Sequence, residues 1–404
     1  MRPQQSPRRK PRTRAAWAVP LLALSLTAAG VTGARSAAAP AEPAGSGRMA
    51  TSTAATCADS VYGAMTGAQR IGQLFMGGIN AATPDQKRIA VLRQYHVGSV
   101  FLAGRSTKGT QATKTVVDGL QAKADTVAGH RVGLLVSTDQ EGGRVQVLSG
   151  PGFSTMPSAL VQGTWTPTKL RDNAAVWAQQ LKAAGVNLNL APVADVVPAS
   201  LGRNNAPIGL YDREFGHTAA TVTPHSNAFA AGFAQSGVLA TVKHFPGLGS
   251  VRGNTDTTAN VVDSVTTTKS SSLIPFASAI KAGIPYVMVS SAVYARIDGR
   301  QQAAFSSTVI DGLLRKTFNF QGVVVSDDIG NAVAVRNVPP GDRAVRFLAA
   351  GGDQVLTVEP NVIPAMVKAV QARMAQNAAF GKQVNTSVHR VLTAKQKAGL
   401  LHCG

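Results

Sequence analysis

Short apolar runs alternate with longer stretches of helical periodicity from about residue 60 onward. Eight of these runs have the length and the β-branched content of strands that are buried on both faces. We expect these strands at residues 74–76, 97–102, 132–136, 186–190, 238–242, 286–289, 323–325 and 354–356. Between and after them, helical periodicity covers residues 114–128, 170–184, 224–236, 270–282, 344–350, 364–378 and 384–398.

Strands that alternate with helices in this way predict an α/β fold with a parallel sheet. Eight such units in about 340 residues, with no internal linker, are typical of a single (β/α)8 TIM-type barrel. An open, doubly wound sheet is the alternative architecture. It usually carries a glycine-rich phosphate loop after the first strand, and the sequence has none at that point. We therefore expect one barrel domain over residues 57–404.

The N-terminal region is unlike the rest of the chain. Residues 2–14 contain six basic residues and no acidic one, residues 15–30 are apolar, and residues 36–39 are small. This order is typical of a secretory signal, so we predict a signal peptide over residues 1–38. Residues 39–56, rich in Ala, Pro, Gly, Ser and Thr, are predicted to be a disordered linker. The apolar segment is shorter than the ~20 residues of a membrane span, so we expect a secreted protein without a stable span.

The charge of the chain is strongly positive, at a formal +20. Without residues 1–48 it is still +13, from 32 basic against 19 acidic residues. An exported protein of this charge is expected to associate with anionic cell-wall polymers. The basic residues are scattered and aromatic residues make up 5% of the chain, so we expect no nucleic-acid partner.

The chain contains two cysteines, Cys57 and Cys403, at the two edges of the predicted domain. An even number of cysteines in an oxidising compartment favours a disulfide. We therefore predict a Cys57–Cys403 bridge that ties the first segment of the domain to the last. Its stabilisation is expected to be on the order of 2–5 kcal/mol.

Polar side chains gather where the predicted strands end. Lys243 and His244 follow the fifth strand, Asp139 follows the third, and Asp327 follows the seventh. The carboxyl ends of barrel strands form one face, which is the catalytic face of TIM barrels. The chain contains no metalloprotease motif, zinc-spaced Cys/His set, serine-hydrolase elbow or phosphate loop, so we expect no metal or cofactor. Paired carboxylates remain, and these are the usual catalytic groups of glycoside hydrolysis.

Six motifs together resemble glycoside hydrolase family 3, and most closely its single-domain β-N-acetylhexosaminidases. The resemblance runs in matching order from about residue 65 to residue 400. The motifs are Asp139-Gln-Glu-Gly-Gly-Arg-Val145, Ala191-Pro-Val-Ala-Asp195, Asp212-Arg-Glu-Phe-Gly216, Lys243-His-Phe-Pro-Gly-Leu-Gly249, Ser326-Asp-Asp328 and Ala350-Gly-Gly-Asp353.

The resemblance implies a retaining mechanism in which Asp327 is the nucleophile. It also implies that Asp139, Arg213, Lys243 and His244 bind the hydroxyl and acetamido groups of the sugar, chemistry that suits a carboxylate acceptor and cationic donors. The implied function is a secreted exo-β-N-acetylglucosaminidase that acts on cell-wall fragments such as muropeptides, or on chitin-derived oligosaccharides. We expect it to be a monomer.

The sequence departs from this branch at the catalytic acid. Members usually have Asp-Ser-His after the Lys-His motif, where the histidine is the general acid/base. Here the corresponding residues are Asn254, Thr255 and Asp256. We predict that Asp256 replaces the histidine, with a pKa raised by burial or by Asp327, and that Asn254 orients it. The structural alternative is an Asx turn in a threonine-rich loop. At Val147, a sugar-binding arginine of the family is also missing.

Three other functions are compatible with the sequence. The chain could be a non-catalytic glycan- or wall-binding protein on the same barrel. It could be a related β-glycosidase, although those members usually have a second α/β domain. It could also be a phosphorylase, in which phosphate replaces water as the acceptor.

Overall fold

The structure is a computed structural model that describes residues 56–401 and residue 403. The predicted signal peptide, residues 1–38, lies outside the described residues. So does the predicted linker, except for Thr56, which caps the first helix. No helix within residues 56–401 combines the length and the apolar character that crossing a membrane requires.

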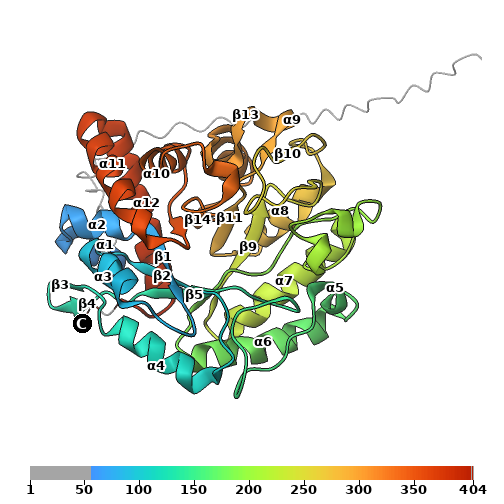
Figure 1. Cartoon of the computed structure of the whole chain (residues 1–404), viewed down its shortest axis with the longest axis horizontal. Coiled ribbons are helices and arrows are strands. Elements are labelled where there is room, and N and C mark those ends of the chain that lie inside the picture. Colours follow the sequence, from blue (N-terminus) through green and yellow to red (C-terminus); the bar gives the residue numbers. More distant parts are fainter. Residues whose placement is uncertain (1–55, 402, 404) are drawn as a thin grey trace, which may run out of the picture. The chain divides into compact units, whose positions relative to one another are not determined.

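Eight parallel strands form the barrel (Figure 1). Neighbouring strands pair in the order β14-β11-β9-β8-β5-β2-β1-β15, and a bridge between Val325 and Gln354 links the two ends of this row. Each of the eight predicted strands is present, and the predicted TIM-type fold is confirmed. The strands are β1 (Phe75–Asn80), β2 (Ser99–Ala103), β5 (Leu135–Thr138), β8 (Leu188–Asn189), β9 (Leu239–Phe245), β11 (Tyr286–Val289), β14 (Val323–Ser326) and β15 (Val355–Thr357).

Alternate residues of these strands point into the barrel, because successive side chains of a strand lie on opposite faces. Large apolar side chains fill the interior, as in other barrels of eight strands. The opposite faces of the strands pack against the helices in a second, larger cluster. The interior cluster includes Met76, Phe101, Leu135, Leu188, Leu190, Tyr286, Met288, Val325 and Leu356.

Helices surround the strands in Figure 1. Among them, α6 packs against α7, α7 against α8, and α10 against α11. The helices are α1 (Cys57–Ala64), α2 (Gly67–Gly72), α3 (Gln86–Gln94), α4 (Gly109–Gln121), α5 (Ala159–Gln162), α6 (Pro167–Ala183), α7 (Ala219–Gln235), α8 (Ile274–Lys281), α9 (Ala295–Asp298), α10 (Pro340–Ala349), α11 (Ile363–Gln376) and α12 (Ala378–Lys397).

The helices depart from the sequence prediction in several places, and α1, α2, α3, α5 and α9 lie outside the predicted helical ranges. The third predicted helix was expected to start at Pro224, whereas the corresponding α7 begins at Ala219 and contains Pro224 in its interior. The Thr218 hydroxyl accepts a hydrogen bond from the Thr221 amide and thereby caps the first turn, which places the start before the proline. A π-helix, η5 (Thr308–Thr317), lies between β11 and β14 and was not predicted.

Short strands build the loops at the carboxyl ends of the barrel strands. Strand β10 (Val262–Asp263) pairs with β12 (Val293–Tyr294), which in turn pairs with β13 (Gly299–Gln302). Strands β6 (Gln140–Gly142) and β7 (Val145–Gln146) form a hairpin directly after β5. A further hairpin, β3 (Thr126–Val127) with β4 (His130–Arg131), precedes β5.

Helix α12 closes the end of the barrel at which the strands begin. Val391 and Ala394 of this helix belong to the interior cluster of the barrel. The predicted disulfide is present and joins Cys57 to Cys403, with a Cα–Cα distance of 5.6 Å. The first and last segments of the domain are therefore linked covalently beside this end of the barrel.

Lys395 on α12 is fully buried, and its Nζ has no hydrogen-bond partner among the described residues. Burial lowers its pKa from 10.5 to about 7, and Asp125 opposes this shift only in part. Between these two pH values the unfolded chain binds more protons than the folded one, so stability rises with pH across this window. Below pH 7 Lys395 is charged in the folded protein as well, so the full free-energy cost of burying its ammonium group lowers the stability.

Replacing Lys395 with methionine is therefore expected to stabilise the protein. We expect a gain on the order of 3 kcal/mol in the free energy of unfolding at pH 6, falling toward zero near pH 10. Urea unfolding at the two pH values measures this difference. Lys382→Met, at an exposed position of the same helix, is the control and should have little effect at either pH. An equal gain at both pH values would contradict the prediction.

Candidate functional site

A cavity of about 300 Å³ opens at the carboxyl ends of the barrel strands. Phe101, Leu190, Met288 and Leu356 line its floor and belong to the filled interior of the barrel. All six residues that the sequence predicts as catalytic or sugar-binding line this one cavity, although they come from five different loops and strands. They are Asp139, Arg213, Lys243, His244, Asp256 and Asp327.

Lys243 lies at the end of β9 and is almost completely buried. Its Nζ is 2.6 Å from Asp139 Oδ1 and 2.6 Å from Glu141 Oε1. Burial alone would lower the pKa of Lys243, but these two carboxylates outweigh it and raise the pKa. The ammonium group is therefore a permanent cation that holds Asp139 at the edge of the cavity.

Arg213 binds Glu141 with both arms of its guanidinium. Arg213 Nε donates to Glu141 Oε2 at 2.8 Å, and Nη2 donates to Oε1 at 2.7 Å. A third nitrogen, Nη1, donates to the carbonyl of Pro207. Burial would raise the pKa of Glu141, but the charges of Arg213 and Lys243 lower it to about 2. Glu141 therefore stays ionised and fixes both cations in place.

His244 is oriented by Asp195, which is fully buried. His244 Nδ1 lies 2.7 Å from Asp195 Oδ2, so its N–H donates to the carboxylate. The other oxygen, Oδ1, accepts from the amides of His244 and Leu248. The second ring nitrogen of His244, Nε2, is thereby turned toward Arg213, at 3.5 Å from Nη2, and toward the cavity.

Glu141 and Asp195 are the two residues of this site that the sequence analysis did not select. Both lie inside motifs that were identified. Glu141 stands two residues after Asp139, and Asp195 ends the segment that follows β8. A signal existed for Glu141, because residues two apart in an extended segment share one side, here the side of Asp139. No local pattern predicts that Asp195 meets a histidine 49 residues away.

Asp327 follows β14 directly, and its amide donates to the carbonyl of Val289 on β11. The neighbouring carboxylate of Asp328 has a different environment. Asp328 Oδ1 accepts from the amides of Gly330, Asn331 and Val358, and so holds the turn after the strand. Burial, together with the charge of Asp327, raises the pKa of Asp328 to about 6.

Asp256 lines the same cavity and lies on the loop after β9. Burial in the cavity wall is the main cause that raises its pKa to about 6, and the negative charge of Asp327 is the second. By its accessible surface, however, Asp256 is exposed at the mouth of the cavity, so solvent screens both effects and reduces the size of the shift in the free protein. A sugar that fills the cavity would displace this water and strengthen them.

The prediction that Asn254 orients the Asp256 carboxylate is wrong. The side-chain oxygen of Asn254 instead accepts from the Asp256 amide at 2.9 Å and closes an Asx turn. The Asx turn proposed as the structural alternative is thus real, but the capping side chain is that of Asn254, so the Asp256 carboxylate is free to face the cavity. Val147 is buried at 8% exposure and offers no polar group to a sugar.

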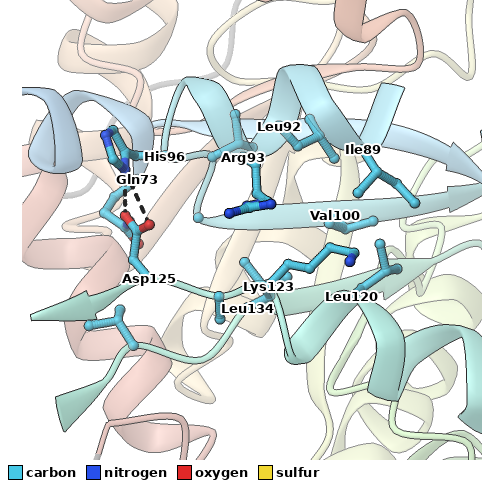
Figure 2. Close-up of a pocket in the computed structure, with 14 residues that line it drawn as sticks. Gln73, Ile89, Leu92, Arg93, His96, Val100, Leu120, Lys123, Asp125 and Leu134 are labelled. Carbon is cyan, nitrogen blue, oxygen red and sulfur yellow. Dashed lines mark hydrogen bonds and ion pairs between the residues drawn. The ribbon is translucent and has the colours of Figure 1, made fainter. Parts of the chain in front are cut away.

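A second cavity lies near the opposite end of the strands, between α3 and α4 (Figure 2). Its volume is about 30 Å³, a tenth of the volume of the cavity at the carboxyl ends. Apolar side chains such as Leu92, Val100 and Leu134 form much of its wall, and His96 pairs with Asp125 at its edge. This space admits water but no sugar ring, so it is not the functional site.

Comparison with known proteins agrees with this geometry. Residues 66–394 match the family model described as "Glycosyl hydrolase family 3 N terminal domain". The chain is 31% identical to the β-hexosaminidase LpqI of Mycobacterium tuberculosis over 334 residues, which cover 81% of this chain and 82% of the relative. It is 38% identical to a β-hexosaminidase of Xylella fastidiosa over 256 residues, which cover 61% of this chain and 73% of the relative.

A solved β-N-acetylhexosaminidase from Beutenbergia cavernae superposes with a TM-score of 0.81. Its sequence is 49% identical, and the match covers 82% of this chain and 99% of that protein. A family 3 β-N-acetylglucosaminidase from Paenibacillus has a TM-score of 0.75 at 28% identity, with 84% of this chain and 64% of that protein covered. The chain is therefore a glycoside hydrolase and belongs to glycosyl hydrolase family 3, within its β-hexosaminidase branch.

Proposed function

We propose that this glycoside hydrolase is a secreted, retaining exo-β-N-acetylglucosaminidase that removes terminal N-acetylglucosamine from cell-wall or chitin-derived glycans. The observation that carries the proposal is the cavity in which Asp256 and Asp327 face the sugar-binding group Asp139, Arg213, Lys243 and His244. Because side chains fill the barrel beneath the cavity floor, a glycan enters from one side only.

The reaction proceeds in two displacements. Asp327 attacks the anomeric carbon while Asp256, in its protonated form, gives its proton to the leaving oxygen. The glycosidic bond breaks and a glycosyl ester forms on Asp327. Asp256, now a carboxylate, takes a proton from water, whose oxygen attacks the anomeric carbon. The ester breaks and N-acetylglucosamine leaves with its β configuration retained.

Export and cell-wall association are supported by three features of the chain. The N-terminal segment has the order of a secretory signal. The Cys57–Cys403 disulfide suits an oxidising compartment. The excess of basic residues favours binding to anionic wall polymers, close to cell-wall substrates such as muropeptides. We propose that the enzyme acts as a monomer, because the cavity is built by one chain.

The test is turnover of p-nitrophenyl N-acetyl-β-glucosaminide by the purified protein, with and without phosphate. We expect free β-N-acetylglucosamine as the first product under both conditions, and little turnover of the corresponding β-glucoside. A sugar phosphate in the presence of phosphate would identify a phosphorylase. Preference for the glucoside would identify a β-glucosidase. Calorimetric binding of N-acetylglucosamine without any turnover would indicate a glycan-binding protein and overturn the proposal.

A further inference from the structure

The loop that carries Asp256 is bound directly to the loop that follows the nucleophile. We call residues 250–261 the Asp256 loop and residues 328–338 the nucleophile loop. The Val333 amide donates to the carbonyl of Asp256 at 3.2 Å, and the Ala334 amide donates to the carbonyl of Thr255 at 3.0 Å. The backbone of the proposed acid is thus attached to the chain six residues after Asp327.

The nucleophile loop takes its shape from one buried arginine. Arg343 on α10 is 6% exposed, and its guanidinium donates to four carbonyls at both ends of the loop. Nε donates to Val338 at 2.6 Å, Nη1 to Ile329 at 3.0 Å and Gly330 at 2.7 Å, and Nη2 to Arg336 at 3.2 Å. The planar fork of arginine makes such a set of fixed bonds, which the single ammonium of lysine cannot reproduce.

Other groups hold the same two loops from the outside. Gln302 Nε2 on β13 donates to the carbonyl of Ala334 at 2.9 Å. The buried Asn205 side chain donates to the carbonyls of Leu248 and Val251, at the start of the Asp256 loop. The end of that loop continues into β10, which pairs with β12. The nucleophile loop is therefore the support directly beneath Asp256 itself.

We propose that Arg343 is a positioning residue for the acid/base Asp256, and that it acts through the two backbone hydrogen bonds from Val333 and Ala334. The inference rests on the proposed function, because it requires Asp256 to be the acid. A general acid must lie within hydrogen-bond reach of the leaving oxygen, and small displacements cost much of its effect. Asp327 follows β14 directly and is anchored by its own amide, which donates to the carbonyl of Val289, so we expect it to depend less on this support.

The first test removes one hydrogen bond between the loops. Val333→Pro deletes the amide that donates to Asp256, and proline fits here because Val333 is the first residue of the 3₁₀ helix η6 (Val333–Val335). The preceding Ala332 has φ −57° and ψ 137°, the conformation that proline requires before it. Val333→Ala keeps the amide and is the matched control.

The second test removes hydrogen bonds between Arg343 and the nucleophile loop. Arg343→Lys keeps the positive charge but cannot donate to all four carbonyls. Its control is Arg315→Lys, at a buried arginine that binds the carbonyls of Phe320 and Gly322 and the carboxylate of Asp353, near the start of β14. Both lysine variants are expected to lower the melting temperature, and only Arg343→Lys should change the leaving-group dependence.

Each variant is assayed on an N-acetylglucosamine disaccharide and on the dinitrophenyl glycoside, whose leaving group needs no proton. We expect Val333→Pro and Arg343→Lys to lower kcat/KM, which reports formation of the glycosyl enzyme, about tenfold on the disaccharide and at most about twofold on the dinitrophenyl glycoside. In an Asp256→Ala background neither change should lower the disaccharide rate further. The two controls should show no difference between the substrates.

The outcomes separate this inference from the proposed function. Equal losses on both substrates, or losses that add to that of Asp256→Ala, would show that Arg343 and Val333 serve folding alone. Either result would overturn the inference and leave the role of Asp256 unchanged. If Asp256→Ala itself affects both substrates equally, the acid assignment fails and this inference fails with it.

Discussion

Asp327→Asn is expected to abolish turnover, with kcat lower by about 10⁴-fold or more, the scale of loss when a covalent nucleophile is removed. The amide has the same shape but cannot form the glycosyl ester. A 2-fluoro or epoxide-type sugar inactivator should label the wild-type protein, and mass mapping should place the label on the peptide that contains Asp327. The Asn variant should remain unlabelled.

Asp328→Asn is the matched control for this experiment, because it removes a carboxylate charge one residue away. Its remaining oxygen can still accept from the amides of Gly330, Asn331 and Val358, so the turn after β14 should persist. We expect this variant to keep most of its activity. Activity in Asp327→Asn above about 1% of wild type, or a label on another carboxylate, would exclude Asp327 as the nucleophile.

Asp256→Ala is expected to separate substrates by their leaving groups. On an N-acetylglucosamine disaccharide we expect kcat to fall about 10²- to 10⁴-fold, the usual contribution of general acid catalysis. Formation of the glycosyl enzyme from the dinitrophenyl glycoside should fall much less, because that phenolate leaves without a proton. Added azide should then attack the glycosyl enzyme in place of water and give the β-glycosyl azide.

The pH dependence supplies an independent test of the same residue. Asp256 must be protonated to act as the acid, and its pKa is raised to about 6 by burial and by Asp327. In the wild type, kcat/KM on the disaccharide should therefore decline as the pH rises through about 6. This decline should be absent in Asp256→Ala. It should remain in Asp328→Asn, which removes the other carboxyl group whose pKa is raised to about 6. An unchanged decline in Asp256→Ala would assign it to another group.

The replacement of histidine by aspartate has a physical consequence. The ordinary pKa of histidine is about 6.5, so its side chain can hold a proton near pH 6. The ordinary pKa of aspartate is about 3.9, so an unperturbed aspartate is ionised at that pH. Asp256 is itself exposed at the mouth of the cavity, but the cavity wall and the charge of Asp327 raise its pKa, and a bound sugar would bury it further. The same carboxylate on an open loop would be a poor acid, so the site depends on how the Asp256 loop is held.

The sequence by itself determined the barrel and most of its catalytic face. Apolar runs of strand length alternate with helical periodicity, and in a parallel barrel this order leaves few other topologies. Because strand ends in such a barrel share one face, Asp139, Lys243 and Asp327 had to converge there. The two cysteines also met as predicted, since the first and last segments of the domain pack together.

Only the tertiary structure decided how these side chains are used. It placed Asp195 behind His244 and Glu141 between Lys243 and Arg213. The paired residues are 49 to 102 positions apart in the sequence, so no local pattern joins them. The structure showed that Asn254 binds the backbone of Asp256 and that Arg343 shapes the loop beneath. Burial and the charge of a neighbouring carboxylate depend on distances in space, so the pKa of Asp256 follows from the fold and from no local pattern of residues.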